Sequence, residues 1–227
     1  FLTGRLSHRP RPDGIVLPGM PGKFTTDGHV QVWPGNTFIC HVDPASDAHR
    51  ALREMQEQVK MSPFHRFFTF LPPSSFHMTV FQGMTEATRL NGDLPADLPR
   101  DISRDAMTAE LLARTRDLAL PQTARVRMMD LFAGKSVTMT GADPAEEEAL
   151  RATRRALRDA TGLNERDFDG YVFHITLAYL VDWVTEPTAR AIAAFSSDLS
   201  DQYRDAVGVV DLGAVELCNF ESMHHFE

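Results

Sequence analysis

The sequence predicts an α+β fold, in which small antiparallel sheets are covered by outer helices. Strand-like runs rich in β-branched and aromatic residues alternate with amphipathic helical stretches, and the order strand, helix, strand, helix occurs in both halves of the chain. We therefore expect one bilobal domain at residues 36–227, with related lobes at about 36–120 and 121–227 and a cleft between them. Residues 1–35 are expected to form an extended N-terminal arm that packs on this domain.

The arm is predicted from its density of Pro and Gly, which argues against a helix between residues 1 and 35. Apolar residues such as Val16, Leu17 and Trp33 lie between these breakers. They favour an arm with turns, packed against the domain, over a disordered leader.

The elements of the first lobe follow from turn residues, caps and apolar spacing. They are a strand at 36–43, a helix that Ser46 can cap and that ends before Pro63, a strand at 66–71, a strand from about 76 to 81 that Gly83 ends, and a helix at about 103–118.

The second lobe shows the same kinds of signal, with Pro at the first helical position and acidic residues in the first helical turn. Its expected elements are strands at 124–132 and 135–140 around an Ala133-Gly134 turn, a helix capped by Asp143 and ended by Gly162, a strand from about 171 to 181, a helix at about 187–199 and a final strand at about 207–220.

Each lobe contains one copy of a short motif, Phe-His-apolar-Thr-apolar. The copies are Phe76-His77-Met78-Thr79-Val80 and Phe173-His174-Ile175-Thr176-Leu177. In a strand, the His and Thr of each copy point to one face and the apolar residues point to the other. One copy alone could be an ordinary strand histidine beside a strand-forming threonine. Two copies with matched flanks indicate a functional pair.

Two imidazoles and two hydroxyls across a cleft suit the opening of a phosphodiester. Histidine titrates near neutrality, so one ring can accept a proton from a nucleophile while the other protonates a leaving group. A threonine hydroxyl can donate to a phosphate oxygen where charge accumulates. Because these donors are neutral, we expect a strained cyclic phosphate rather than an ordinary diester.

These paired motifs resemble the two-histidine phosphoesterase superfamily, which includes the LigT-like cyclic phosphodiesterases and the 2′-5′ RNA ligases. The resemblance covers residues 36–227, and the run Pro-Gly-Asn-Thr-x-Ile-Cys-His at 34–41 resembles an uncharacterised bacterial and fungal branch. It implies a metal-independent hydrolase of 2′,3′-cyclic or related ribose cyclic phosphates, with no cofactor.

The resemblance also carries residue roles. It implies that His77 and His174 are the catalytic acid and base, in an order that the sequence does not fix, and that Thr79 and Thr176 bind the phosphate. The long arm and the acidic charge depart from the pattern of the ligases, and they count against RNA 2′-5′ ligase activity more than against the chemistry.

The net charge and the cysteine content limit the kinds of partner and the cellular location that we expect. The formal net charge of -8 argues against duplex DNA and anionic membrane surfaces, and we expect a small nucleotide or an RNA-end cyclic phosphate as the substrate. Cys40 and Cys218 lie in apolar runs and are predicted to be buried thiols in a cytoplasmic protein. No apolar run is long enough to span a membrane. We expect the chain to act as a monomer.

Two other functions would also use such a pocket. One is a nucleotide- or phosphate-binding module with little or no turnover, although intact His and Thr at all four positions favour an enzyme. The other is a zinc hydrolase that uses His77, His174 and a third histidine. The lack of a carboxylate or cysteine close to either motif counts against it.

Further residues were weighed as site candidates. Lys135 follows Ala133-Gly134, but the earlier glycine of a P-loop is missing, so the match is rejected. Tyr179 is expected on the face opposite His174. His41 could touch the ligand. The remaining candidates are assigned to the solvated surface: Arg125 and Arg127 on a strand face, His65 in a loop, and His224-His225 in a tail.

Overall fold

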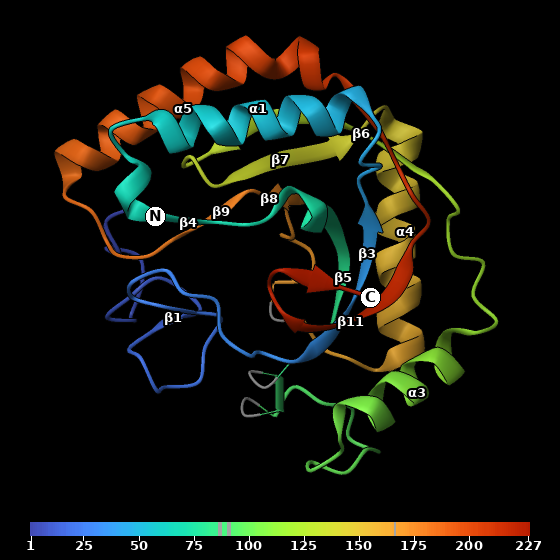
Figure 1. The fold of residues 1–227 in the computed structure, drawn as a ribbon. Helices are drawn as coiled ribbons and strands as arrows, with labels where there is room; N and C mark the ends of the chain where they lie inside the picture. Colours follow the sequence, from blue (N-terminus) through green and yellow to red (C-terminus); the bar gives the residue numbers. More distant parts are fainter. Residues whose placement is uncertain (86–87, 90–91, 166) are drawn as a thin grey trace.

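A computed structural model describes residues 1–85, 88–89, 92–165 and 167–227, and a curved eight-stranded antiparallel sheet lies at its centre (Figure 1). The sheet order is β10-β6-β7-β8-β5-β3-β11-β12. This confirms the α+β class, with one change: the two expected sheets are continuous, because β5 pairs with β8 at the centre. The strands are β3 (Gly35–His41), β5 (His77–Thr85), β6 (Ala124–Phe132), β7 (Ser136–Gly141), β8 (His174–Thr176), β10 (Val209–Leu212), β11 (Glu216–Ser222) and β12 (His225–Phe226).

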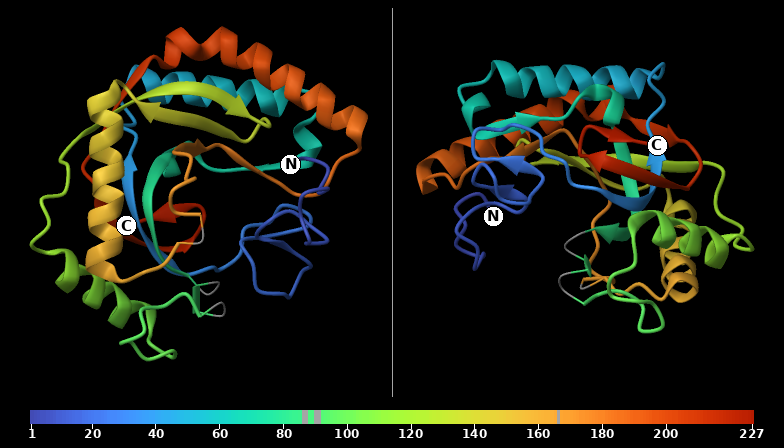
Figure 2. Two further views of the ribbon diagram at one scale, coloured as in Figure 1. Left: turned by 180° about the vertical axis from the view of Figure 1, so that it is seen from behind. Right: turned by 60° about the horizontal axis from the view of Figure 1, so that its bottom comes forward.

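The long helices lie along the outside of the sheet, and α1 and α5 run side by side (Figures 1 and 2). They are α1 (Asp47–Met61), α3 (Arg104–Thr115), α4 (Pro144–Thr161) and α5 (Glu186–Val207). The predicted caps are present: the Ser46 side chain accepts from the His49 amide and Asp143 accepts from the Ala145 amide. Gly162 ends α4 in the left-handed conformation, where glycine carries no steric penalty.

The strand expected at 171–181 is broken, and the continuous strand was a wrong prediction. Leu177 separates β8 from β9 (Ala178–Leu180), and β9 pairs with β4 (Phe68–Phe70) in a second sheet. The Leu177 carbonyl accepts from the Leu71 amide at 3.0 Å and from the buried Gln56 Nε2 at 2.9 Å. These hydrogen bonds take the place of strand-to-strand hydrogen bonds at Leu177, and beyond it the chain leaves the main sheet. The final strand is likewise divided, into β10 and β11.

The apolar backs of both motifs are buried in the main core, as the alternation of side chains predicted. The core residues that the two motifs contribute are Phe76, Met78, Val80, Phe173, Ile175 and Leu177. The polar His and Thr of each motif are therefore left on the opposite, concave face of the sheet.

The N-terminal segment lies against this concave side, and Figure 2 shows it from two further directions. Its strands β1 (Ile15–Val16) and β2 (Phe24–Thr25) pair in parallel. Phe24 is fully buried, and its ring lies 4.9 Å from that of Tyr179. The Val184 amide donates to the Leu2 carbonyl at 3.0 Å. In the described part of the chain, no helix has both the length and the apolar character needed to cross a bilayer.

Candidate active site

The register of the central strands brings the two motifs together. Met78 of β5 pairs with Ile175 of β8 in antiparallel fashion. One step to either side of that pair, His77 is opposite Thr176 and Thr79 is opposite His174. The four side chains thus form a quartet on one face, with the two histidines on a diagonal.

Each imidazole is held by the same type of backbone contact, with the carbonyl two residues earlier in the chain. His77 Nδ1 lies 2.7 Å from the Ser75 carbonyl, and His174 Nδ1 lies 2.8 Å from the Val172 carbonyl. A carbonyl only accepts, so each Nδ1 carries the proton and donates it. Each Nε2 is thereby left with its lone pair, which suits proton transfer.

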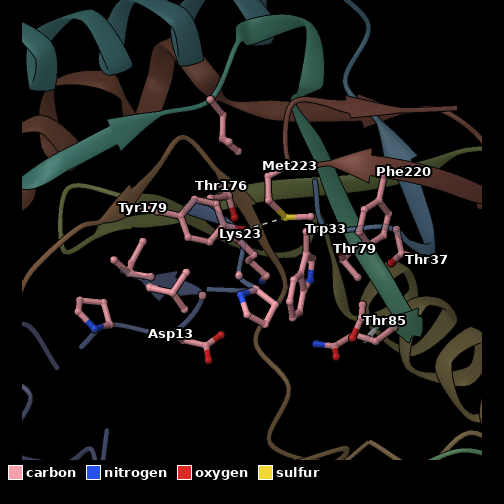
Figure 3. A pocket seen from close by; sticks show the side chains of 18 of the residues that line it. Asp13, Lys23, Trp33, Thr37, Thr79, Thr85, Thr176, Tyr179, Phe220 and Met223 are labelled. Carbon is pink, nitrogen blue, oxygen red and sulfur yellow. Dashed lines mark hydrogen bonds between the residues drawn. The ribbon is translucent and has the colours of Figure 1, made fainter. Parts of the chain in front are cut away.

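All four predicted site residues line one cavity of about 620 Å³. The sheet and the segment after β8 form one side, and residues 9–23 of the arm form another. Figure 3 shows Thr79 and Thr176 in this cavity, together with Tyr179, Lys23 and Trp33. A cavity of this size accommodates a small ligand such as a nucleotide.

The environments of the two histidines differ. The ring of Phe226 lies 4.2 Å from that of His77, centroid to centroid. Burial lowers the pKa of His77 to about 4, and the neighbouring His41 and His174 contribute in the same direction. His77 is therefore neutral at pH 7.

His174 lies in a more cationic environment. Burial lowers its pKa, and the charges of Lys135 and Lys23 add to this effect. The hydrogen bond to Val172 opposes the shift. Two rings with the same backbone contact are thus tuned by different neighbours.

Comparison with known proteins shows the family of the chain. The family model 2H-phosphodiest, described as a domain of unknown function (DUF1868), matches residues 23–137, which is just over half of the chain. The chain belongs to this two-histidine phosphodiesterase family. The match includes His77 and ends before His174, whose place beside it comes from the pairing of β5 with β8.

One solved structure extends the likeness to the whole fold. A conserved protein of unknown function from Agrobacterium tumefaciens str. C58, ATU0111, has a TM-score of 0.87 and 28% identity, over 98% of this chain and 94% of that one. TT0787 of Thermus thermophilus is more distant, with a TM-score of 0.39 and 20% identity over 81% and 86% of the two chains. No curated protein matches the chain.

The sequence misplaced one side chain of the two-histidine site, Tyr179, and did not indicate two others, Lys23 and Phe226. Tyr179 lines the cavity, contrary to the expected opposite face, because the break at Leu177 interrupts strand parity. Lys23 reaches the cavity from the arm, and Phe226 reaches it from the C-terminal hairpin. A lone lysine among Pro and Gly, or a Phe near a chain end, carries no sequence pattern that would have marked it.

The predicted tail at His224-His225 is also corrected. His225 begins β12, and it is exposed and ion-paired with Glu227. His224 instead packs on Phe24, with ring centroids 5.9 Å apart. The C-terminal segment is thus a strand with a packed turn before it, because β12 pairs with β11.

His41 lies beside the site without lining the cavity. It pairs in register with His77, and its Nε2 is 3.7 Å from the Cys218 thiol. Single ligand atoms of His41, Glu216 and Cys218 lie within 4.8 Å of one another, so these residues could hold a metal ion. Burial, and then the charge of Glu216, raise the pKa of Cys218 to about 11, which keeps it a thiol in the absence of a metal. Both cysteines are free and buried, as predicted.

Arg125, Arg127 and His65 do not line the cavity, whereas Lys135 lies immediately before β7, the strand that pairs with β8. Arg125 and Arg127 are exposed, and Arg125 is ion-paired with Asp211 across the strand pair. His65 is exposed in a 3-10 turn. Lys135 follows a tight β6–β7 hairpin turn, in which Ala133 and Gly134 both have positive φ, so this segment is no phosphate loop.

A buried ion pair supports the segment that leads to His174. Arg154 of α4 is 1% exposed and lies 2.5 Å from the Glu165 carboxylate. Arg154 also donates to the Val80 carbonyl at 2.5 Å, and Glu165 accepts from the Gln82 amide at 2.6 Å. The Arg154 guanidinium lies 3.9 Å from the ring centroid of Tyr171. The pair therefore joins α4, β5 and the approach to β8.

Proposed function

We propose that the protein is a metal-independent cyclic phosphodiesterase that opens a 2′,3′-cyclic or related ribose cyclic phosphate. The observation that carries this proposal is the quartet of two imidazoles and two hydroxyls on one face, all lining a single cavity. A pair of imidazoles supplies both a base and an acid, and ring opening at phosphorus needs both.

In the proposed reaction His77 is the base. Its neutral Nε2 takes a proton from water as the water oxygen attacks phosphorus. The bond between phosphorus and one ribose oxygen breaks, and His174, in its protonated form with a proton on both ring nitrogens, donates the Nε2 proton to that oxygen. The product is a ribose monophosphate. The low pKa of His77 keeps its Nε2 unprotonated at neutral pH and therefore free to accept the proton.

The hydroxyls of Thr79 and Thr176 are proposed to donate to the non-bridging oxygens. These oxygens gain charge as the attacking oxygen approaches, so donors fixed on two neighbouring strands act without reorganisation.

The decisive experiment is hydrolysis of a panel of 2′,3′-cyclic nucleotides and of ADP-ribose cyclic phosphate, with EDTA present. We expect turnover that EDTA does not reduce, because no step requires a metal. A Cys218→Ser variant tested in parallel should keep this activity. Loss of turnover in EDTA, restored by zinc in the wild type and not in the variant, would favour a metal role for the group near His41.

The same panel addresses the alternatives. A binding module would take up the ribose monophosphate products without hydrolysing any cyclic substrate. A 2′-5′ ligase-like enzyme would act on RNA ends in preference to mononucleotides. The cavity wall formed by the arm favours the small substrate. The cytoplasmic location and the monomeric state stay predictions from the sequence.

A further inference from the structure

The arm places positive charge on the cavity wall of an acidic protein. Arg9, Arg11 and Lys23 line the cavity, against Asp13 as the carboxylate from the same segment. Arg9 and Asp13 are ion-paired with each other. Arg11 and Lys23 are outside that ion pair and line the cavity, although the whole chain carries a net charge of -8.

Lys23 is held in place by contacts within the arm. Its amide donates to the Gly14 carbonyl at 2.9 Å, and its carbonyl accepts from the Gln31 amide at 2.9 Å. A Cβ atom at Gly14 would lie 2.7 Å from Lys23 Cδ, so a glycine is needed where the lysine stem passes. Lys23 Nζ lies 5.4 Å from the ring centroid of Tyr179, and Figure 3 shows the side chain in the cavity.

A second ammonium, that of Lys135, lies near the site, although Lys135 does not itself line the cavity. Lys135 is half-buried, and its carbonyl accepts from the amides of Leu177 and Ala178, next to Thr176. Its Nζ lies 5.1 Å from the ring centroid of Phe1, and it has no ion-pair partner among the described residues. Burial, and then the charge of Lys23, lower its pKa to about 8. Two lysines whose charges repel each other are stabilised by an anion between or beside them.

The quartet already provides groups for one phosphate. Two acid-base rings and two hydroxyl donors converge there from the adjacent strands β5 and β8. The lysines come from other elements, the arm and the β6–β7 turn, and the cavity of about 620 Å³ is large enough for a whole nucleotide. The positive charge of these two lysines therefore fits a second anionic group of the ligand better than the reacting phosphate.

We propose that Lys23, reinforced by Lys135, forms a second anion subsite, so that the ligand is a small nucleotide bearing another phosphate in addition to the cyclic one. This inference rests on the proposed function for its reacting group. The subsite itself can be tested by binding, without any turnover.

The probes are adenosine 2′-monophosphate and adenosine 2′,5′-bisphosphate, titrated into the full chain by calorimetry at fixed ionic strength. We expect the wild type to bind the bisphosphate at least about tenfold more tightly, which is roughly 1.4 kcal/mol. Lys23→Met should reduce that ratio to below about threefold, whereas Lys23→Arg should retain it. The matched control is Arg127→Gln, which removes an exposed cation from β6 and should leave the ratio unchanged.

A positional variant keeps the test informative if Lys23→Met is unstable. Gly14→Ala retains both lysines but displaces the Lys23 stem, and it too should reduce the ratio. A wild-type ratio near one would overturn the subsite. An equal loss of affinity for both probes in Lys23→Met would also overturn it, because Lys23 would then contact the shared phosphate. Tight bisphosphate binding without hydrolysis of any cyclic nucleotide would refute the proposed function and leave the subsite standing.

Discussion

The proposed reaction should be fastest on the acidic side of neutrality. In the assignment above, His77 must be neutral and His174 must be protonated in the free enzyme. The pKa of His77 is about 4, so His77 is already largely neutral at pH 5. The pKa of His174 is lowered from 6.5, so its protonated fraction decreases well before pH 7.

These values set the size of the effect. Because the pKa of His174 lies below 6.5, at most about one molecule in a hundred carries the required proton at pH 8.5. We therefore expect kcat/KM to fall tenfold per pH unit on the alkaline limb, and to be at least about a hundredfold below its plateau at pH 8.5. The acidic limb should lie near pH 4, where His77 becomes protonated.

The assay is kcat/KM for a 2′,3′-cyclic nucleotide between pH 4 and 9 at constant ionic strength. Two variants test which histidine gives rise to which limb of the pH profile. Lys135→Met removes a charge that lowers the pKa of His174, so the alkaline limb should move to higher pH. Phe226→Ala exposes His77, so the acidic limb should move up from pH 4. A rate maximum above pH 7, or limbs that respond to the opposite variants, would refute the assignment.

Four other substitutions test the quartet and its support. His77→Ala and His174→Ala should each lower kcat by about a hundredfold or more, measured at the pH optimum. Thr79→Ala should lower kcat by about ten- to a hundredfold with little change in KM, and an unchanged kcat would remove the hydroxyl from the site. Arg154→Met leaves the largely buried Glu165 carboxylate without its ion-pair partner and should cost about 3–5 kcal/mol in urea denaturation, against less than about 1 kcal/mol for the exposed Arg155→Met on the same helix.

The quartet could be predicted from sequence because its signal is local and occurs twice. The two-residue period of a strand places His77 with Thr79 and Met78 on the other face, and the same holds around His174. The matched flanks then indicate that both strands serve one site. Only the pairing of Met78 with Ile175 had to come from the structure, because strand register depends on contacts that are remote in sequence.

The rest of the site is built from features without a sequence pattern. The break at Leu177 depends on hydrogen bonds from Gln56 and Leu71, both more than a hundred residues earlier in the chain. Tyr179 reaches the cavity only because of that break. Lys23 is positioned by its packing against Gly14, within a segment whose Pro and Gly content predicts turns but not what they face.

The asymmetry of the site has the same origin, and it explains how a repeated motif can divide acid and base work. Both copies place Nδ1 against the backbone carbonyl two residues earlier, so the motif itself makes the two rings equivalent. Phe226 comes from the C-terminal hairpin and packs on His77, whereas Lys23 and Lys135 act on His174. The elements outside the repeat thus make the rings different, and substitutions there should exchange or blur their roles while the motif stays intact. An enzyme in which Phe226→Ala and Lys135→Met together left both limbs of the pH profile in place would show that the division of roles lies elsewhere.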